Sequence, residues 1–121
     1  MGFSIGTKGY LGTGTDQVSS FNDFWEYNPA TNAWLQKANV GGGARYGTAA
    51  FVIGGKGYVC SGTINPADLW EYNPATDTWL QKANLPGLTR GYSVGFAIGY
   101  KGYVSTGDNS SSLKDLWEYT Q

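Results

Sequence analysis

The chain has 121 residues, a length typical of one domain. Charged residues make up only 14% of it and the formal net charge is -1, so it offers neither a basic surface for nucleic acid nor a polybasic run for a membrane. No apolar run reaches the ~18 residues that a membrane-spanning helix needs. We therefore expect no nucleic acid and no membrane among its partners.

The composition predicts an all-β protein. Nineteen glycines supply tight turns, and nine tyrosines with five tryptophans suit the pleated surface of a sheet. Cys60 is the single cysteine, so the chain forms no internal disulfide.

Three related phrases divide the chain into repeats. They begin at Phe3, Phe51 and Phe96 and read FSIGTKGYLGTG, FVIGGKGYVCSG and FAIGYKGYVSTG, at spacings of 48 and 45 residues. A repeat of this length indicates one supersecondary unit that buries its apolar faces only by stacking on its neighbours.

Each unit contains four strand-like runs in chain order. The first is small and apolar (RYGTAAFVIG, RGYSVGFAIG), and a glycine turn joins it to the second, KGY and the residues after it. The third begins at Asp23, Asp68 and Asp115, and the fourth surrounds Trp34 and Trp79. Asn-Pro-Ala-Thr between the last two fits a type I turn. No run has a helical period, so each unit is predicted to be a four-stranded antiparallel meander.

Side-chain size changes across the unit. The first strand carries small residues, including Gly47, Thr48, Ala49 and Ala50, whereas Tyr and Trp lie on later strands. Sheets set radially around an axis are crowded at the centre and spread at the rim, which requires such a gradient. The unit is therefore predicted to be a β-propeller blade.

The repeat resembles the kelch repeat, on its period near 50, its glycine-bearing second strand and its spaced Tyr and Trp. IGGKGYV, DLWEYNPATDTW and LPGLTR are similar to repeats of bacterial, galactose-oxidase-like kelch proteins. The glycine doublet that closes the second strand in that family is altered here to GTG, CSG and STG. The resemblance implies a β-propeller, and a secreted or cell-surface location in bacteria for the parent protein.

We assign blade one to residues 3–44, blade two to 45–89 and blade three to 90–121, the last lacking its outermost strand. A kelch ring needs about five to seven blades, so about two and two-thirds blades predict a C-terminal fragment of a longer parent. Both end faces would be exposed. We expect homo-oligomerisation to close the incomplete ring, with a dimer favoured and a trimer or strand exchange left open.

Loops at one end of the blades vary between repeats, as binding loops on a rigid scaffold do. Asp16 and Asp108 lie in these loops, and Arg45 and Arg90 start the innermost strands at the same end, near the channel mouth. The arginines either bind an anionic ligand or anchor a blade to a neighbouring loop. The two aspartates either contact a polar ligand or cation, or are solvated loop acids.

The sequence favours a non-catalytic protein. It contains no histidine, so a Ser-His-Asp relay and imidazole metal ligands are absent, and the copper site of galactose-oxidase-like relatives cannot be assembled. We expect no catalytic residue, metal or cofactor, and a scaffold whose loop face binds a protein or carbohydrate. The alternative is a piece of a secreted carbohydrate-active enzyme, of epimerase or oxidase type, with its catalytic residues in absent blades.

Overall fold

The computed structural model describes residues 1–63 and 67–121, and in these the regular elements are all strands. They form three antiparallel sheets, here called the first, second and third sheet. The first sheet contains β1 (Gly2–Ile5), β2 (Lys8–Thr15), β3 (Ser20–Asn28) and β4 (Ala33–Lys37); the second contains β5 (Ala49–Ile53), β6 (Lys56–Cys60), β7 (Leu69–Asn73) and β8 (Thr78–Lys82); the third contains β9 (Val94–Ile98), β10 (Lys101–Ser105) and β11 (Leu116–Thr120).

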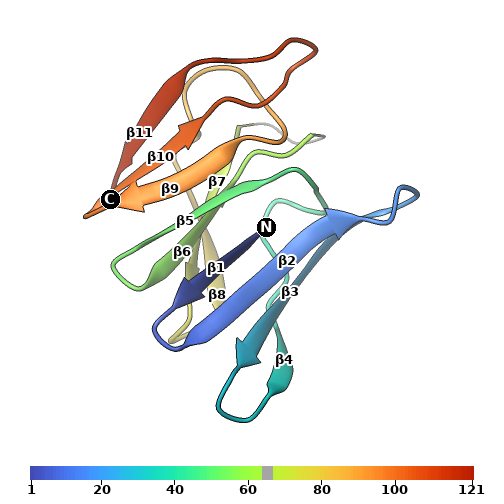
Figure 1. Ribbon diagram of the computed structural model, residues 1–121, viewed down its shortest axis with the longest axis vertical. Coiled ribbons are helices and arrows are strands. Elements are labelled where there is room, and N and C mark those ends of the chain that lie inside the picture. Colours follow the sequence, from blue (N-terminus) through green and yellow to red (C-terminus); the bar gives the residue numbers. More distant parts are fainter. Residues whose placement is uncertain (64–66) are drawn as a thin grey trace.

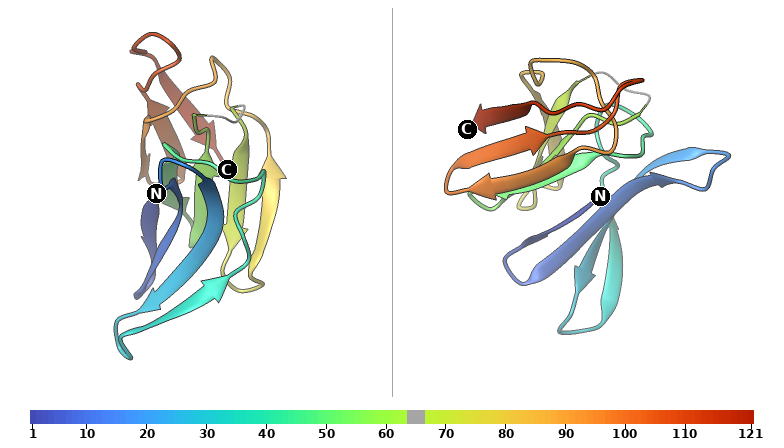
Figure 2. Two further views of the ribbon diagram at one scale, coloured as in Figure 1. Left: turned by 90° about the vertical axis from the view of Figure 1, so that its right-hand side faces the viewer. Right: turned by 45° about the horizontal axis from the view of Figure 1, so that its top comes forward.

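Each sheet is a meander in which strands pair in chain order, as predicted. The third sheet ends with β11 and has three strands, whereas the first has four because Gly2–Ile5 pairs with β2 from the very start of the chain. The second sheet lies between the other two in both figures (Figures 1 and 2). The blade limits at 44/45 and 89/90 fall in the links between sheets and stay a prediction.

The turns before β4 and β8 follow the predicted Asn-Pro-Ala-Thr chemistry. The side chain of Asn28 accepts a hydrogen bond from the Ala30 amide, and Asn73 does the same for Ala75, both at 3.0 Å. Each turn then ends on a left-handed residue with φ near +50°, a conformation that Asn and Asp tolerate better than most side chains.

The first strands of the three units lie side by side and are crowded. A side chain at Gly95 of β9 would approach the Ala50 carbonyl oxygen of β5 to 2.5 Å. The close approach of these strands leaves room only for a small residue at Gly95, as the size gradient predicted for the first strand of each unit.

Aromatic side chains fill the space between the first and second sheets. Phe24 is fully buried and packs edge-on against Tyr72 and Trp79, at centroid distances of 4.8 and 5.0 Å. The Asp77 carboxylate accepts hydrogen bonds from the Tyr72 hydroxyl and from the Ala38 amide in the link between the sheets, each at 3.0 Å. Asp77 thus holds the first sheet's link against the second sheet.

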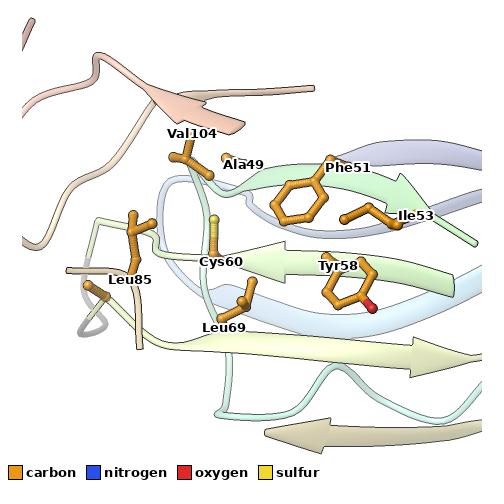
Figure 3. Packing of buried hydrophobic residues seen from close by; sticks show 9 residues of the cluster. Ala49, Phe51, Ile53, Tyr58, Cys60, Leu69, Leu85 and Val104 are labelled. Carbon is orange, nitrogen blue, oxygen red and sulfur yellow. The ribbon is translucent and has the colours of Figure 1, made fainter. Parts of the chain in front are cut away.

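A second cluster joins the second and third sheets. Its members include Phe51, Tyr58, Cys60 and Leu69 of the second sheet and Val104 of the third (Figure 3). Cys60 has no exposed surface, and burial raises the pKa of its thiol to about 12, so it acts as a small apolar side chain.

One contact recurs in both junctions. The Phe3 ring of the first sheet lies on Gly57 of the second, and the Phe51 ring of the second lies on Gly102 of the third. In each case the ring leaves no room for a Cβ atom on the glycine. The Phe that opens each repeat and the glycine of KGY in the next repeat are therefore the two halves of one packing contact.

Candidate functional site

Arg45 forms a buried ion pair. Its guanidinium donates to both carboxylate oxygens of Asp68, at 2.7 and 2.8 Å, and to the Ser61 carbonyl at 3.1 Å. The Arg45 side chain has no exposed surface. The geometry is the bidentate one that makes Arg-carboxylate pairs strong. It ties the segment before β5 to both ends of the connection between β6 and β7.

Arg90 repeats this arrangement one sheet later. It donates to both carboxylate oxygens of Asp115, at 2.6 and 2.7 Å, and to the Thr106 carbonyl at 3.1 Å. The hydrogen bonds from Arg90 hold the pKa of Asp115 well below its usual range. In contrast to Asp68, the Asp115 side chain keeps 37% of its surface exposed.

A tryptophan completes each cluster. The indole N–H of Trp70 donates to Asp68 at 2.7 Å, and that of Trp117 donates to Asp115 at 2.6 Å. Trp25 donates to Asp23 in the same way in the first sheet, where no arginine among the described residues forms an ion pair with Asp23. The Asp-x-Trp pair therefore belongs to the repeat, and the arginine is added by the segment that enters each following sheet.

The recurring Lys, Tyr and Glu side chains form a second network, which sequence reasoning missed. Lys56 and Tyr58 donate to the Glu71 carboxylate at 3.0 and 2.7 Å. The first and third sheets contain the same three-residue network around Glu26 and Glu118. The sequence contained a signal for this network. Lys and Tyr of KGY are two residues apart and therefore lie on the same face of the second strand, where Glu of WEY on the third strand can reach both.

A pocket of about 180 Å³ lies where the loops of the second and third sheets meet. It is formed by the start of the loop after β6, the segment that leads into β9, and the loop after β10. The lining residues are Gly62, Thr63, Thr89, Arg90, Gly91, Tyr92, Asp108, Asn109 and Ser110.

The pocket brings together two of the four predicted site residues. Arg90 lines it although the residue is only 1% exposed and its guanidinium is bonded to Asp115. Asp108 lines it with its main chain bonded to Gly91 in both directions, at 2.9 and 3.0 Å. Among the described residues, no hydrogen bond to the Asp108 carboxylate is formed.

The other two predicted residues lie outside the pocket. Arg45 is enclosed in the ion pair with Asp68. Asp16 is exposed and shapes its own loop, since its carboxylate accepts from the amides of Ser19 and Val18 at 2.6 and 2.9 Å. These bonds lower the pKa of Asp16.

Sequence reasoning missed Tyr92, Thr63 and Asn109. A signal for Tyr92 was available, because the second unit reads Arg-Tyr-Gly after its link whereas the third reads Arg-Gly-Tyr. The exchange moves the aromatic side chain to a different position in the same loop. Thr63 and Asn109 lie in loops that do not align between repeats, so comparing the repeats could not identify them.

The described residues hold no group of three or more His, Cys, Asp or Glu side chains that could bind a metal ion. No helix suited to crossing a membrane occurs in them.

Comparison with known proteins decides the fold. No family model matches the chain, and no curated protein does. Among solved structures, the chain is similar to YjhT, with a TM-score of 0.76 over 88% of its length. The chain has a β-propeller-like fold. At 19% identity the likeness concerns the fold alone, and the match spans 44% of the YjhT chain, less than half of it.

Proposed function

We propose that this chain is a non-catalytic kelch-type propeller fragment that assembles with copies of itself into a closed ring and offers its loop end for binding. The observation that carries the proposal is the phenylalanine-on-glycine contact, which occurs twice within the chain and leaves one unused half at each end. The ionisable side chains that recur between repeats support a scaffold, because they form the same internal ion pairs in each sheet.

The backbone at the end of each second strand supports the kelch assignment. Thr13, Ser61 and Thr106 all have φ near +60°, and each is followed by a glycine with positive φ. They occupy the first position of the family's glycine doublet, where a left-handed residue is expected to be glycine. The altered doublet thus keeps a backbone conformation that glycine adopts without strain.

The outer face of the third sheet is apolar and uncovered. Phe96 is 42% exposed, and Val94, Ile98 and Leu116 are each more than half exposed. Fully burying a side chain of this kind contributes about 1.5–3 kcal/mol. The equivalent face of the second sheet is buried by the third, so a partner of the same shape would recover this free energy.

The outer face of the first sheet offers the matching surface. Gly9 is the counterpart of Gly57 and Gly102, but a Cβ atom there would meet nothing closer than the Tyr27 Cβ at 3.9 Å. Leu11 beside it is 53% exposed. We therefore expect Phe96 of one copy to lie on Gly9 of another, as Phe3 lies on Gly57.

Such a contact is head-to-tail, and it generates a closed ring if a whole number of equal rotations from chain to chain makes a full turn. A dimer would bring together six sheets, within the range of about four to eight blades known for propellers. A trimer would bring together nine, so the dimer is preferred.

Gly9→Ala tests this proposal, measured by size-exclusion chromatography with light scattering. The Cβ atom has room within one chain, so the variant is expected to fold with unchanged stability but to remain monomeric where the wild type is a dimer. Gly57→Ala is the matched variant at an occupied glycine and is expected to lose stability instead. Thr31→Ala, in an exposed turn, is the control.

The proposal fails if the wild type is a folded monomer at all accessible concentrations. It also fails if Gly9→Ala assembles as well as the wild type, since the proposed contact cannot accommodate that Cβ.

A further inference from the structure

We propose that the pocket between the second and third sheets is a subsite for one neutral pyranose sugar, with Tyr92 as its stacking surface and Asp108 as an acceptor for its hydroxyl groups. This inference rests on the binding half of the proposed function and not on ring closure, because every lining residue belongs to one chain.

Tyr92 breaks the repeat at a strained position. The residue two places after the arginine is left-handed in both sheets, with φ of +67° at Gly47 and +57° at Tyr92. Glycine adopts this conformation without strain, whereas a bulky side chain rarely does. Of the non-glycine residues described with positive φ, Tyr92 is the only aromatic one. Strain of this kind persists where the surrounding structure fixes it, often at functional sites.

Packing within the chain does not account for the ring of Tyr92, because the residue is 67% exposed. Among the described residues, its ring makes one aromatic contact, edge-on to Tyr46 with centroids 6.2 Å apart. Its position is fixed by the backbone: the Tyr92 amide donates to the Gly47 carbonyl at 2.7 Å, and Thr63 leaves no room for a side chain at Gly91. Tyr92 is therefore a lining residue of the pocket that keeps most of its surface exposed instead of burying it.

Several other lining residues of the pocket are polar and held in place by hydrogen bonds. The main-chain bonds between Gly91 and Asp108 join the two loops, and the Asn109 side-chain amide donates to the Thr89 carbonyl at 2.6 Å. Asp108 is an exposed lining residue of the pocket, and its carboxylate has no hydrogen-bond donor among the described residues. A preformed pocket with an unused acceptor needs little reorganisation to bind a ligand.

The charges select the chemistry of the ligand. Arg90 and Asp108 are the charged lining residues, and Arg90 is neutralised by Asp115 and inaccessible. The remaining charge is negative, which disfavours anionic ligands. An exposed aromatic face suits the C–H face of a pyranose ring, and carboxylate, amide and hydroxyl groups suit its hydroxyls. The volume of about 180 Å³ lies below the roughly 300–1,000 Å³ of drug-sized sites, which favours a single sugar unit.

The test is a titration of the ¹⁵N-labelled full chain, followed by amide chemical shifts. The probes are the methyl glycosides of D-galactose, D-glucose and D-mannose, with D-glucuronate as the anionic comparator. At least one neutral glycoside is expected to bind with millimolar affinity and to shift the amides of Gly91, Tyr92 and Asp108. Glucuronate is expected to bind more weakly.

Tyr92→Gly is the decisive variant, because it restores the residue type of Gly47. It is expected to raise the melting temperature by relieving strain and to weaken sugar binding at least about tenfold, which corresponds to 1.4 kcal/mol. Asp108→Asn is expected to weaken binding as well. The matched controls are Tyr100→Ala, an exposed tyrosine outside the pocket, and Asp16→Asn; neither is expected to change binding.

The inference is overturned if no neutral glycoside shifts the pocket amides of the folded protein, if glucuronate binds as well as the neutral sugars, or if Tyr92→Gly keeps wild-type affinity. Light scattering on the same samples separates this outcome from failure of ring closure. Gly9→Ala is expected to bind the sugar normally even as a monomer.

Discussion

The second and third sheets have nearly the same sequence in different surroundings. Phe51 and Ile53 of the second sheet are 4% and 1% exposed, whereas their counterparts Phe96 and Ile98 are 42% and 67% exposed. The ion pairs differ in the same way: Asp68 is buried with Arg45, while Asp115 is partly open beside Arg90. A repeat thus specifies the side chains of a unit, but the neighbouring unit decides which of them form the core.

The effect of a mutation on stability is expected to differ most between the two sheets at the phenylalanines that open each repeat. Phe51→Ala should lower the free energy of unfolding by roughly 3–5 kcal/mol, because it leaves a cavity in the buried junction. Phe96→Ala should cost less than about 1 kcal/mol in dilute, monomeric protein, because its ring is already partly in water. Urea denaturation measures both, with Val18→Ala as an exposed apolar control. Equal losses in the monomer would contradict the comparison.

The loss of stability on removing the arginine of an ion pair should differ less between the two sheets. Arg45→Met leaves the buried Asp68 carboxylate without its cation and is expected to cost about 3 kcal/mol, near the low end for a broken buried pair because Trp70 still donates to Asp68. Arg90→Met leaves a carboxylate that water can reach, so a loss of about 1 kcal/mol is expected. Urea unfolding at one fixed protein concentration tests this, with Lys101→Met as the control at an exposed pair. A larger loss for Arg90→Met would refute the expectation.

The smallest expected difference concerns pH. Burial acts to raise the pKa of Glu71, but hydrogen bonds from Tyr58 and Lys56 outweigh it and hold the pKa below 4.5. The folded state then binds fewer protons than the unfolded state, so this stabilisation is complete above about pH 4.5 and is lost as the pH falls through the lower, folded-state pKa.

Glu71→Gln should therefore cost about 1.5 kcal/mol at pH 7 and flatten the acid limb of stability against pH. Glu118 also has a lowered pKa, through its bond from Lys101, but it is exposed, so Glu118→Gln should change the profile less. Thermal unfolding between pH 7 and acid pH compares the two. A steeper loss of stability at acid pH in Glu71→Gln than in the wild type would contradict the predicted direction of the Glu71 contribution.

The local structure could be predicted from the sequence, because the repeat displays each strand and turn several times. Individual elements can be identified without any knowledge of what they pack against. The recurring KGY and WEY phrases mark the second and third strands, the Asn-Pro pairs mark turns, and the run of small residues marks the first strand. The contact of Phe3 with Gly57 could not be predicted, since it depends on how one sheet is rotated against the next. The sequence offered an anchoring role for Arg45 and Arg90 as one of two alternatives, but it did not show that each arginine pairs with an aspartate of the sheet that it enters.

Only some of the residues that line the candidate pocket could be identified from the sequence. Asp108 was identified because its loop differs between repeats, whereas Tyr92 was overlooked because the exchange of Tyr and Gly after the arginine keeps the same residue types. Its importance follows from a backbone angle, which composition and spacing do not report.

The pairing of Phe51 with Gly102 has a consequence for how such a chain can grow. Every unit carries a projecting ring on one side and an empty place for a ring on the other, so each unit is complementary to its own duplicate. Adding another unit in tandem would require no newly designed surface. The number of units in a finished ring would then be decided by the angle between adjacent sheets, and a modest change in that angle would alter the count without changing a single contact residue.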